Sequence, residues 1–461
     1  MPNDETPGVY IDETPAGPAT IPPWGETVAA FVGHTERATG AAGEDVTLIP
    51  QRVGSLAEFE SLFGGAQPEV GVRVDVVETP AGRDVRAAWA DGVGPRHVVH
   101  PSLQLYFANG GRSALIVSVG RFGPDGAGPV ADELRAGVDA LAAVDEVSLI
   151  VVPETRWLPE AEYAAVYRQA LDQCAERKDR FVLLDLPGSG SDGGAPSSVV
   201  DRFREADLGS HHRYGAAYWP DVITHLPPAV DEARVEVVHT VDGVPGAAVP
   251  LAEVDATLGT QVRAAIADLR VSVPPSGAVA GVYAHFDRTR GVWKAPAGIE
   301  LKGVAGPAAE LTARELDALQ EPTRRSVNVI RRLAGRGIQV WGARTLAGAD
   351  TEFRYVNVRR LVSHVEDSVR RGLWQFVFEP NDAATWARVR QLVDGFLTGL
   401  WQAGALVGTK PEEAFRVDVG LGRTMTQQDV VDGLLVLSVG LATTRPAEFI
   451  IVRFGQRQQA G

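Results

Sequence analysis

Strand and helix patterns alternate through the middle of this chain, and this alternation limits the folds that it can adopt. From about residue 129 to 287, apolar β-rich runs such as Val147–Val152 and Phe181–Leu186 alternate with amphipathic stretches such as Pro159–Arg177. Parallel strands need crossover connections, which are usually helical, so the pattern predicts an open parallel sheet covered by helices. We therefore expect an α/β domain over residues 126–290.

The flanking regions have mixed α+β patterns, and 461 residues exceed what one hydrophobic core usually holds. Residues 24–125 open with a buried strand at Val28–Gly33 and contain a weakly patterned excursion at 71–100. Residues 291–444 contain helices, one of which opens at a capping box of Thr312 and Glu315 and another of which Asp382 can cap. The sequence therefore predicts a multidomain chain of α/β and α+β parts.

Each end of the chain resembles a lone β-strand. Residues 1–23 include the strand-like Val9, Tyr10 and Ile11, and residues 445–461 include the run Phe449, Ile450, Ile451 and Val452. Unpaired strand edges are costly and invite pairing with another chain. These ends are predicted to be linking arms that add strands to neighbouring subunits, although pairing within their own domain would satisfy them equally well.

The net charge of −15 argues against general nucleic-acid binding, but basic residues are concentrated in one segment. Between residues 322 and 372 there are eleven arginines and four acidic residues, a net charge of +7. Such a segment is a candidate docking surface for an acidic partner, unless its charges pair within the chain. The candidates are Arg324, Arg325, Arg331, Arg332, Arg359, Arg360, Arg370 and Arg371.

No coherent set of catalytic or metal-binding residues is evident, so we expect no enzyme activity, no cofactor and no metal. The run Gly188–Gly193 matches a dinucleotide-binding fingerprint, but its loop continues to Pro196 and lies on the second strand of the alternation rather than the first. The histidine pairs His97–His100 and His211–His212 lack the spacing of a zinc motif, and Cys174 fits a packed thiol. A nucleotide-binding α/β enzyme that uses residues 188–193 remains the alternative function.

Several short blocks resemble contractile tail sheath proteins of phages and phage-derived injection systems, in the order in which that family has them. They include the opening Thr6–Glu13 and the glycine-rich blocks Leu62–Gly65 and Tyr106–Gly111. The remaining blocks are Lys294–Gly298, Val340–Leu346, Tyr355–Arg360, Phe378–Asp382 and Arg445–Ile451.

This resemblance implies a structural protein without catalysis. It implies a subtilisin-like domain lacking a peptidase site, inserted between the two parts of a sheath core, with residues 291–444 facing a tube. Subunits would stack as hexameric rings around an inner tube protein and contract to drive that tube through a target envelope. Baseplate and terminator or cap proteins would be further partners, and the arginines above would face the tube.

The N-terminus is acidic and Pro-rich rather than basic and then apolar, and no apolar run has the length of about 20 residues that spans a bilayer. We therefore expect no membrane insertion. Assembly is expected in the cytoplasm, as part of a phage tail or phage-like injection particle that lysis would release.

Overall fold

The computed structural model of the chain describes residues 21, 25–68, 71–80, 82–89, 95–123, 127–188, 196–319, 321 and 324–446. The chain divides into two compact units. The larger unit contains the described residues from Gly25 to His364, and the smaller contains Ile21 and Val365–Thr444. Each unit is described by itself below.

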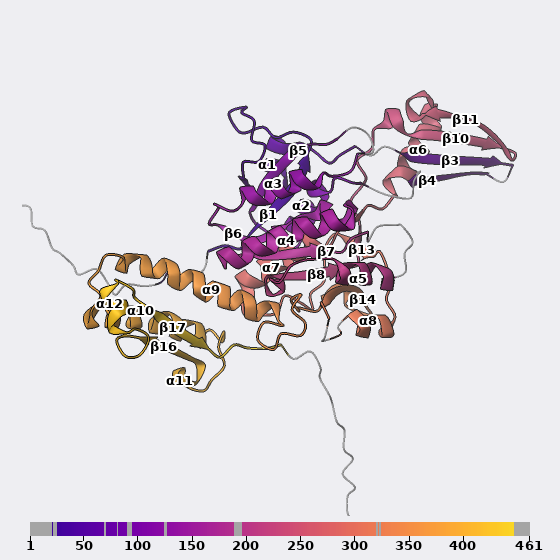
Figure 1. Ribbon diagram of the computed structural model, residues 1–461. Helices are drawn as coiled ribbons and strands as arrows, with labels where there is room; N and C mark the ends of the chain where they lie inside the picture. Colours follow the sequence, from indigo (N-terminus) through magenta and orange to yellow (C-terminus); the bar gives the residue numbers. More distant parts are fainter. Residues whose placement is uncertain are drawn as a thin grey trace, which may run out of the picture. The chain divides into compact units, whose positions relative to one another are not determined.

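An eight-stranded sheet forms the centre of the larger unit (Figure 1). Its spatial order is β15-β14-β8-β7-β6-β1-β5-β2, and the pairs from β14 through β5 are all parallel. The two outer strands, β15 and β2, pair antiparallel. The strands are β1 (Val28–Thr35), β2 (Gln51–Val53), β5 (Ala114–Arg121), β6 (Val147–Val151), β7 (Phe181–Asp185), β8 (Gly215–Trp219), β14 (Val327–Leu333) and β15 (Gly337–Trp341).

Helices cover both faces of this sheet, as the alternating pattern predicts. Alternate residues of β1 face opposite sides, so Phe31 joins one hydrophobic core and Val32 the other. The Val32 side holds α3 (Ala131–Ala140), α4 (Glu160–Arg177) and α5 (Pro196–Glu205), and the Phe31 side holds α1 (Leu56–Phe63), α2 (Val99–Ala108) and α7 (Ser276–Arg290). The prediction of a mixed α/β chain is confirmed.

Two glycines bring α2 and α7 unusually close together. A Cβ atom added at Gly277 would lie 2.5 Å from the backbone oxygen of Ser102, and one added at Gly281 would lie 2.4 Å from that of Tyr106. No real Cβ atom tolerates such a contact, so this crossing requires glycine on α7.

The excursion at residues 71–100 contributes to a second, four-stranded sheet in the larger unit. Its hairpin of β3 (Val72–Thr79) and β4 (Gly82–Trp89) pairs along β3 with β10 (Glu236–Val241), which in turn pairs with β11 (Val244–Pro250). Helix α6 (Ala256–Ala267) packs on this sheet (Figure 1). Two excursions about 150 residues apart thus share one small core, which includes Val74, Val237 and Val262.

The larger unit is completed by short elements. A three-stranded sheet contains β9 (Val222–Thr224), β12 (Ser272–Val273) and β13 (Val304–Pro307). Helix α8 (Ala313–Leu319) begins at the expected capping box, in which Thr312 and Glu315 bond reciprocally. The 3-10 turns are η1 (Pro153–Trp157), η2 (His212–Tyr214), η3 (Glu232–Arg234) and η4 (Leu251–Glu253).

The domain boundaries expected near residues 125 and 290 do not divide the main sheet. Strand β1, from the first stretch, pairs with β5 on one side and with β6, from the second stretch, on the other. Strand β14, from the third stretch, pairs with β8. Parallel pairing joins strands that are distant in sequence, so changes of composition along the chain do not mark the edges of this sheet.

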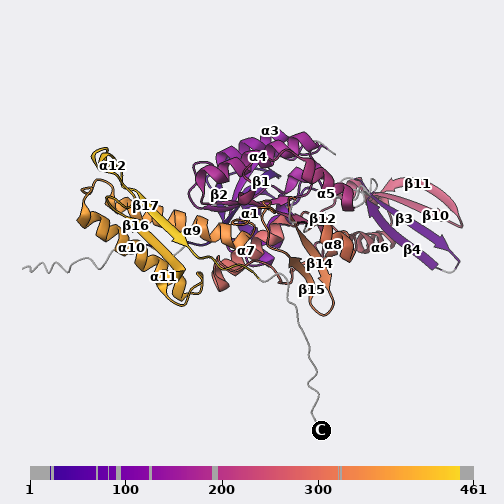
Figure 2. The ribbon, with the colours of Figure 1, turned by 60° about the horizontal axis from the view of Figure 1, so that its bottom comes forward.

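The smaller unit packs helix α10 (Ala383–Gln402) on a two-stranded sheet of β16 (Phe415–Val419) and β17 (Leu437–Leu441) (Figure 2). Helix α9 (Val356–Leu373) enters this unit at Val365. Short elements complete it, namely η5 (Trp374–Phe376), α11 (Pro411–Ala414) and α12 (Gln427–Val431). None of the helices in the described parts of the chain combines the length and the apolar character that crossing a bilayer requires.

Candidate assembly surfaces

The β16–β17 sheet has two open edges. The two strands pair antiparallel from Phe415–Leu441 to Val419–Leu437, and among the described residues no third strand pairs with either of them. One face of the sheet is closed by the apolar side of α10, which begins where the Asp382 carboxylate accepts from the amide of Thr385. A two-stranded ribbon exposes backbone donors and acceptors on both sides, so it can accept strands from other chains.

Tryptophans fix the ends of α10 rather than forming a ligand site. Trp386 Nε1 donates to Asn381 Oδ1 at 2.7 Å, and Trp401 Nε1 donates to the carbonyl of Gly408 at 2.9 Å. Both rings are half-buried. These two hydrogen bonds hold the loops that flank α10 against the helix.

Ile21 and Thr444, near the two ends of the described chain, both belong to the smaller unit. Ile21 is buried, and a Cβ atom at Gly372 of α9 would lie 2.6 Å from its side chain. After β17, Thr444 Oγ1 donates to the carbonyl of Ala405 at 2.9 Å. The strand-like residues predicted to be arms (Val9, Tyr10, Ile11, Phe449, Ile450, Ile451 and Val452) lie outside the described residues, so that prediction stays open.

The smaller unit also exposes large apolar side chains that the sequence analysis did not single out. Trp374 is 71% exposed, Phe378 103% and Val431 70%. The segments that carry them are linked, because Asn381 Nδ2 donates to the carbonyl of Leu434 at 2.9 Å. Exposed apolar patches often mark binding surfaces, so these side chains are candidates for contact with a partner. The other exposed members are Val377, Leu434 and Val436.

Phe378 has a backbone conformation that few side chains adopt. Its φ is +74°, the left-handed region that favours glycine. Neighbouring groups hold this turn, since Glu379 donates its amide to the carbonyl of Phe376 and its carboxylate pairs with Arg388. Such strain is often found where function requires a particular geometry, here an aromatic ring presented to solvent.

Two carboxylates at the starts of short helices carry fixed charge in the smaller unit. Hydrogen bonds from Thr426, first from its backbone amide and then from its hydroxyl, lower the pKa of Asp429 at the start of α12. Hydrogen bonds from Thr409 likewise lower the pKa of Glu413. Both carboxylates are therefore ionised at neutral pH.

The arginine-rich segment does not form one surface. Arg359 and Arg360 are 3% and 4% exposed, so the structure removes them from the set of partner-facing candidates. Arg360 forms a buried ion pair with Asp287, and the Arg359 guanidinium lies over the ring of Phe353. The sequence could not show this, because Arg359 and Arg360 adjoin the apolar residues on the buried side of α9. The sequence does not indicate how far around the helix that buried side extends.

The remaining arginine candidates are exposed to different degrees. Arg325 is half-buried and donates to the carbonyls of Phe203 and Ala206 at the end of α5, and Arg331 lies 5.7 Å from the ring of Trp341. The most exposed are Arg324 and Arg332 in the larger unit and Arg370 and Arg371 at the end of α9. Arg370 and Arg371 both pair with Asp367.

Of the glycine-rich run, the structure describes only Gly188. Its φ is +60°, and a Cβ atom there would lie 2.9 Å from the guanidinium of Arg202 on α5. The other residues of the run, 189–193, lie outside the described residues. Arg202 thus packs against the start of the loop.

Comparisons with known proteins all indicate one family. A family profile described as phage tail sheath C-terminal domain matches residues 349–457. The tail sheath protein of Vibrio phage KVP40 is 29% identical over 137 residues, which span 29% of this chain and 20% of the phage protein. The chain therefore spans well under two thirds of that curated relative.

Solved structures match over nearly the whole chain. The helical sheath of the anti-feeding prophage (AFP) in its contracted state is 30% identical, with a TM-score of 0.65, and the match covers 98% of this chain and 99% of that one. The PVC sheath complex of an extracellular contractile injection system, also contracted, is 26% identical with a TM-score of 0.67 and 99% coverage of both chains. The match includes both compact units.

Proposed function

Because this chain belongs to the contractile tail sheath proteins, a family of structural subunits, we propose that it polymerises with copies of itself into a helical sleeve. The observation that carries the proposal is the β16–β17 sheet, whose two outer edges pair with no further strand among the described residues. Strands contributed by the arms of neighbouring subunits would complete those edges and link the lattice.

Within that sleeve, subunits would stack as hexameric rings around an inner tube protein, in an extended, metastable state. After a trigger from the baseplate, they would rotate as nearly rigid bodies, and the sleeve would shorten and drive the tube through a target envelope. A sheet with helices on both faces suits rotation as a nearly rigid body, and the arms would provide the hinges. Baseplate and terminator or cap proteins complete the expected partners of a particle that assembles in the cytoplasm and is released on lysis.

Assembly can be tested with two deletions and one matched pair of substitutions. Removing residues 1–15 or 446–461 should leave folded subunits that form no tubes in negative-stain electron microscopy. Val431→Asp should also impair assembly, because it places a charge on the exposed apolar surface. Val244 on β11 is equally exposed, at 70%, so Val244→Asp controls for the added charge.

Normal tubes from the deleted chains would contradict the role of the arms. An equal loss of tubes in the two valine variants would show that the surface around Val431 has no special part in assembly. Circular dichroism of each variant separates failure to assemble from failure to fold.

We propose that exposed arginines of each unit contact the tube, namely Arg324 and Arg332 in the larger unit and Arg370 and Arg371 in the smaller, with the half-buried Arg325 and Arg331 of the larger unit as further candidates. Contacts between exposed charges are screened by salt and release readily, which suits a surface that must let go of the tube during contraction. Reversing the four exposed charges to Glu should reduce co-purification with the tube protein while sheath polymers still form. Undiminished co-purification would refute this assignment.

A further inference from the structure

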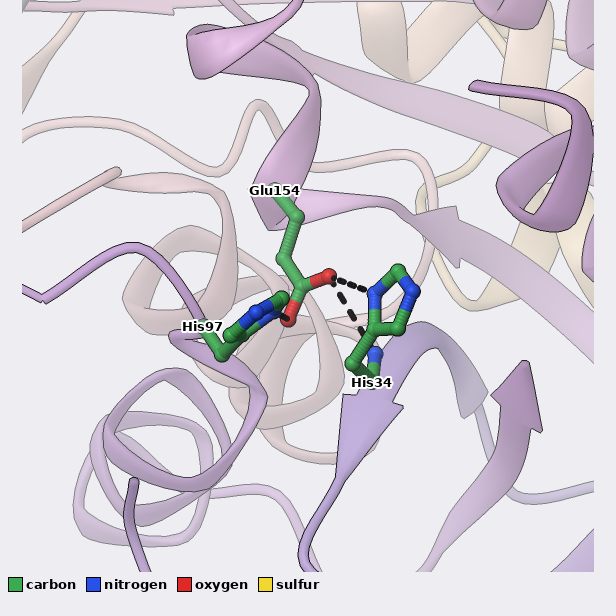
Figure 3. A group of neighbouring side chains, drawn as sticks. All are labelled: His34, His97 and Glu154. Carbon is green, nitrogen blue, oxygen red and sulfur yellow. Dashed lines mark hydrogen bonds and ion pairs between the residues drawn. The ribbon is translucent and has the colours of Figure 1, made fainter. Parts of the chain in front are cut away.

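A buried cluster of two histidines and a glutamate lies at the carboxyl edge of the main sheet (Figure 3). His34 is near the end of β1, and Glu154 lies in η1, directly after the neighbouring parallel strand β6. His97 precedes α2, which packs on β1. The cluster therefore joins three segments that are far apart in the sequence.

The sheet topology makes this a favourable place for a ligand. The parallel strands β5, β1, β6, β7 and β8 stand in the spatial order 2-1-3-4-5 when numbered along the chain. The direction of winding thus reverses between β1 and β6. In open α/β sheets, ligands characteristically bind outside the carboxyl ends of the strands at such a reversal.

The three side chains converge and are shielded from water. His34, His97 and Glu154 are 4%, 2% and 0% exposed, and one donor atom from each lies within 4.8 Å of the others. His34 Nδ1 is 2.7 Å from Glu154 Oε2, and His97 Nδ1 is 3.4 Å from Glu154 Oε1. Donors around a zinc ion at about 2 Å stand about 3 Å apart, so the separations of the two histidines from the Glu154 carboxylate, 2.7 Å and 3.4 Å, fit one shared ion. The bound of 4.8 Å on the widest separation means that the side chains would close slightly around the ion.

His97 has polar atoms that the surrounding protein does not use. Neither of its ring nitrogens makes a hydrogen bond to any residue that the structure describes, and the ring stacks on Phe122 with centroids 5.4 Å apart. Glu154 Oε1 likewise accepts no hydrogen bond within the described chain. Apart from the 3.4 Å contact between His97 Nδ1 and Glu154 Oε1, these buried atoms have no polar partner among the described residues. Buried polar groups without hydrogen bonds are costly, so an additional ligand is expected there.

His34 has the second contact that a metal-bound histidine normally makes. Its Nε2 lies 2.7 Å from the carboxylate of Glu133 on α3, which is 48% exposed. A carboxylate that accepts from the distal N–H fixes the tautomer and leaves the other nitrogen free to bind metal.

We propose that His34 Nδ1, His97 Nδ1 and the Glu154 carboxylate bind a divalent transition-metal ion, with zinc as the ion that best fits two imidazoles and one carboxylate. Glu133 orients His34 from outside the coordination sphere. The ion would tie the ends of β1 and β6 to the start of α2 and so stiffen the subunit that must rotate as a body. The sequence spacing of His97 and His100 concealed the site, because His100 pairs with Glu60 instead.

The test is the metal content of the full-length protein, purified without a polyhistidine tag from zinc-supplemented culture. Mass spectrometry of the dialysed protein should give about one zinc ion per chain, whether or not the chains have polymerised. His97→Phe keeps a stacked ring on Phe122 but removes the ligand, so its zinc content should fall to background. His239→Ala removes another histidine that pairs with a carboxylate, Glu78, and should keep its zinc.

A second variant covers the case in which His97→Phe fails to fold. Glu133→Gln alters a half-exposed side chain and should weaken zinc binding about 10–100-fold in a chelator competition without unfolding the chain. A wild-type protein that holds no metal after incubation with equimolar zinc would overturn the proposal. So would equal zinc loss in the His97 and His239 variants, or unchanged affinity in Glu133→Gln.

Discussion

The buried pair of Arg360 and Asp287 allows a sharp test of how the arginine-rich segment works. The side chains are 4% and 9% exposed. Among the described residues, Asp287 receives one hydrogen bond besides those from Arg360, from Thr27 Oγ1 at 2.6 Å, and the guanidinium lies 4.9 Å from the ring of Tyr283. Removing Arg360 would leave a buried carboxylate with a single donor.

We expect Arg360→Met to lower the free energy of unfolding by about 3–5 kcal/mol, the usual cost of leaving one partner of a buried ion pair uncompensated. This corresponds to an increase of about 10²–10⁴-fold in the unfolding equilibrium constant. The double variant Arg360→Met/Asp287→Asn removes both charges and should recover more than half of the loss, since Asn can still accept from Thr27. Arg332→Met, at an exposed position, should cost at most about 1 kcal/mol.

Urea unfolding of arm-deleted subunits, followed by circular dichroism and tryptophan fluorescence, measures these differences. The slope of free energy against urea must stay the same for the comparison to hold. If Arg360→Met stays within 1 kcal/mol of the parent, while tube binding is lost, then Arg360 acts at a surface and the assignment to the core is wrong. Failure of the double variant to recover stability would show that the ring of Tyr283, rather than Asp287, accounts for the cost.

Two further predictions concern the core of the larger unit. Burial raises the pKa of Asp185 to about 7. Between about pH 4 and pH 7 the folded state therefore binds more protons than the unfolded state, and the free energy of unfolding falls as the pH rises. Asp185→Asn can keep the bond from the Ser276 amide and should flatten this slope in urea unfolding across that range; an unchanged slope would contradict the shift. Gly281→Ala should lower the melting temperature, because the new Cβ atom meets the Tyr106 carbonyl and such overpacking costs about 1–3 kcal/mol. Gly395→Ala on α10, where a Cβ atom meets nothing within 4 Å, should instead raise stability by up to about 1 kcal/mol, and a matching loss in both variants would refute the packing argument.

Much of the local structure could be predicted because its causes lie within a few residues. The Asp382 cap of α10 and the Thr312–Glu315 capping box are observed where the sequence indicates them. The strand at Val28–Gly33 is observed as β1, extended by two residues. Caps and apolar runs act over one or two turns, so neighbouring residues are enough to specify them.

The candidate surfaces were harder to predict. Charge along the sequence marked Arg359 and Arg360 as partner-facing, but burial depends on which side of α9 meets the core. The open β16–β17 sheet was not foreseen, because the connection between its two strands contains α12 and is too long to mark a hairpin. Whether the edge of a strand is paired depends on all the strands of its sheet, and a short sequence pattern does not contain that information.

The sequence alone determined that this chain is a mixed α/β protein, through its alternation of strand and helix, and indicated its family through short blocks in a fixed order. Only the tertiary structure decided which strands share a sheet, and it joined two distant excursions through β3 and β10. It alone brought His34, His97 and Glu154 together. The physical reason is that helix caps and hydrophobic periodicity act locally, whereas strand pairing and side-chain convergence depend on contacts between residues more than 100 positions apart.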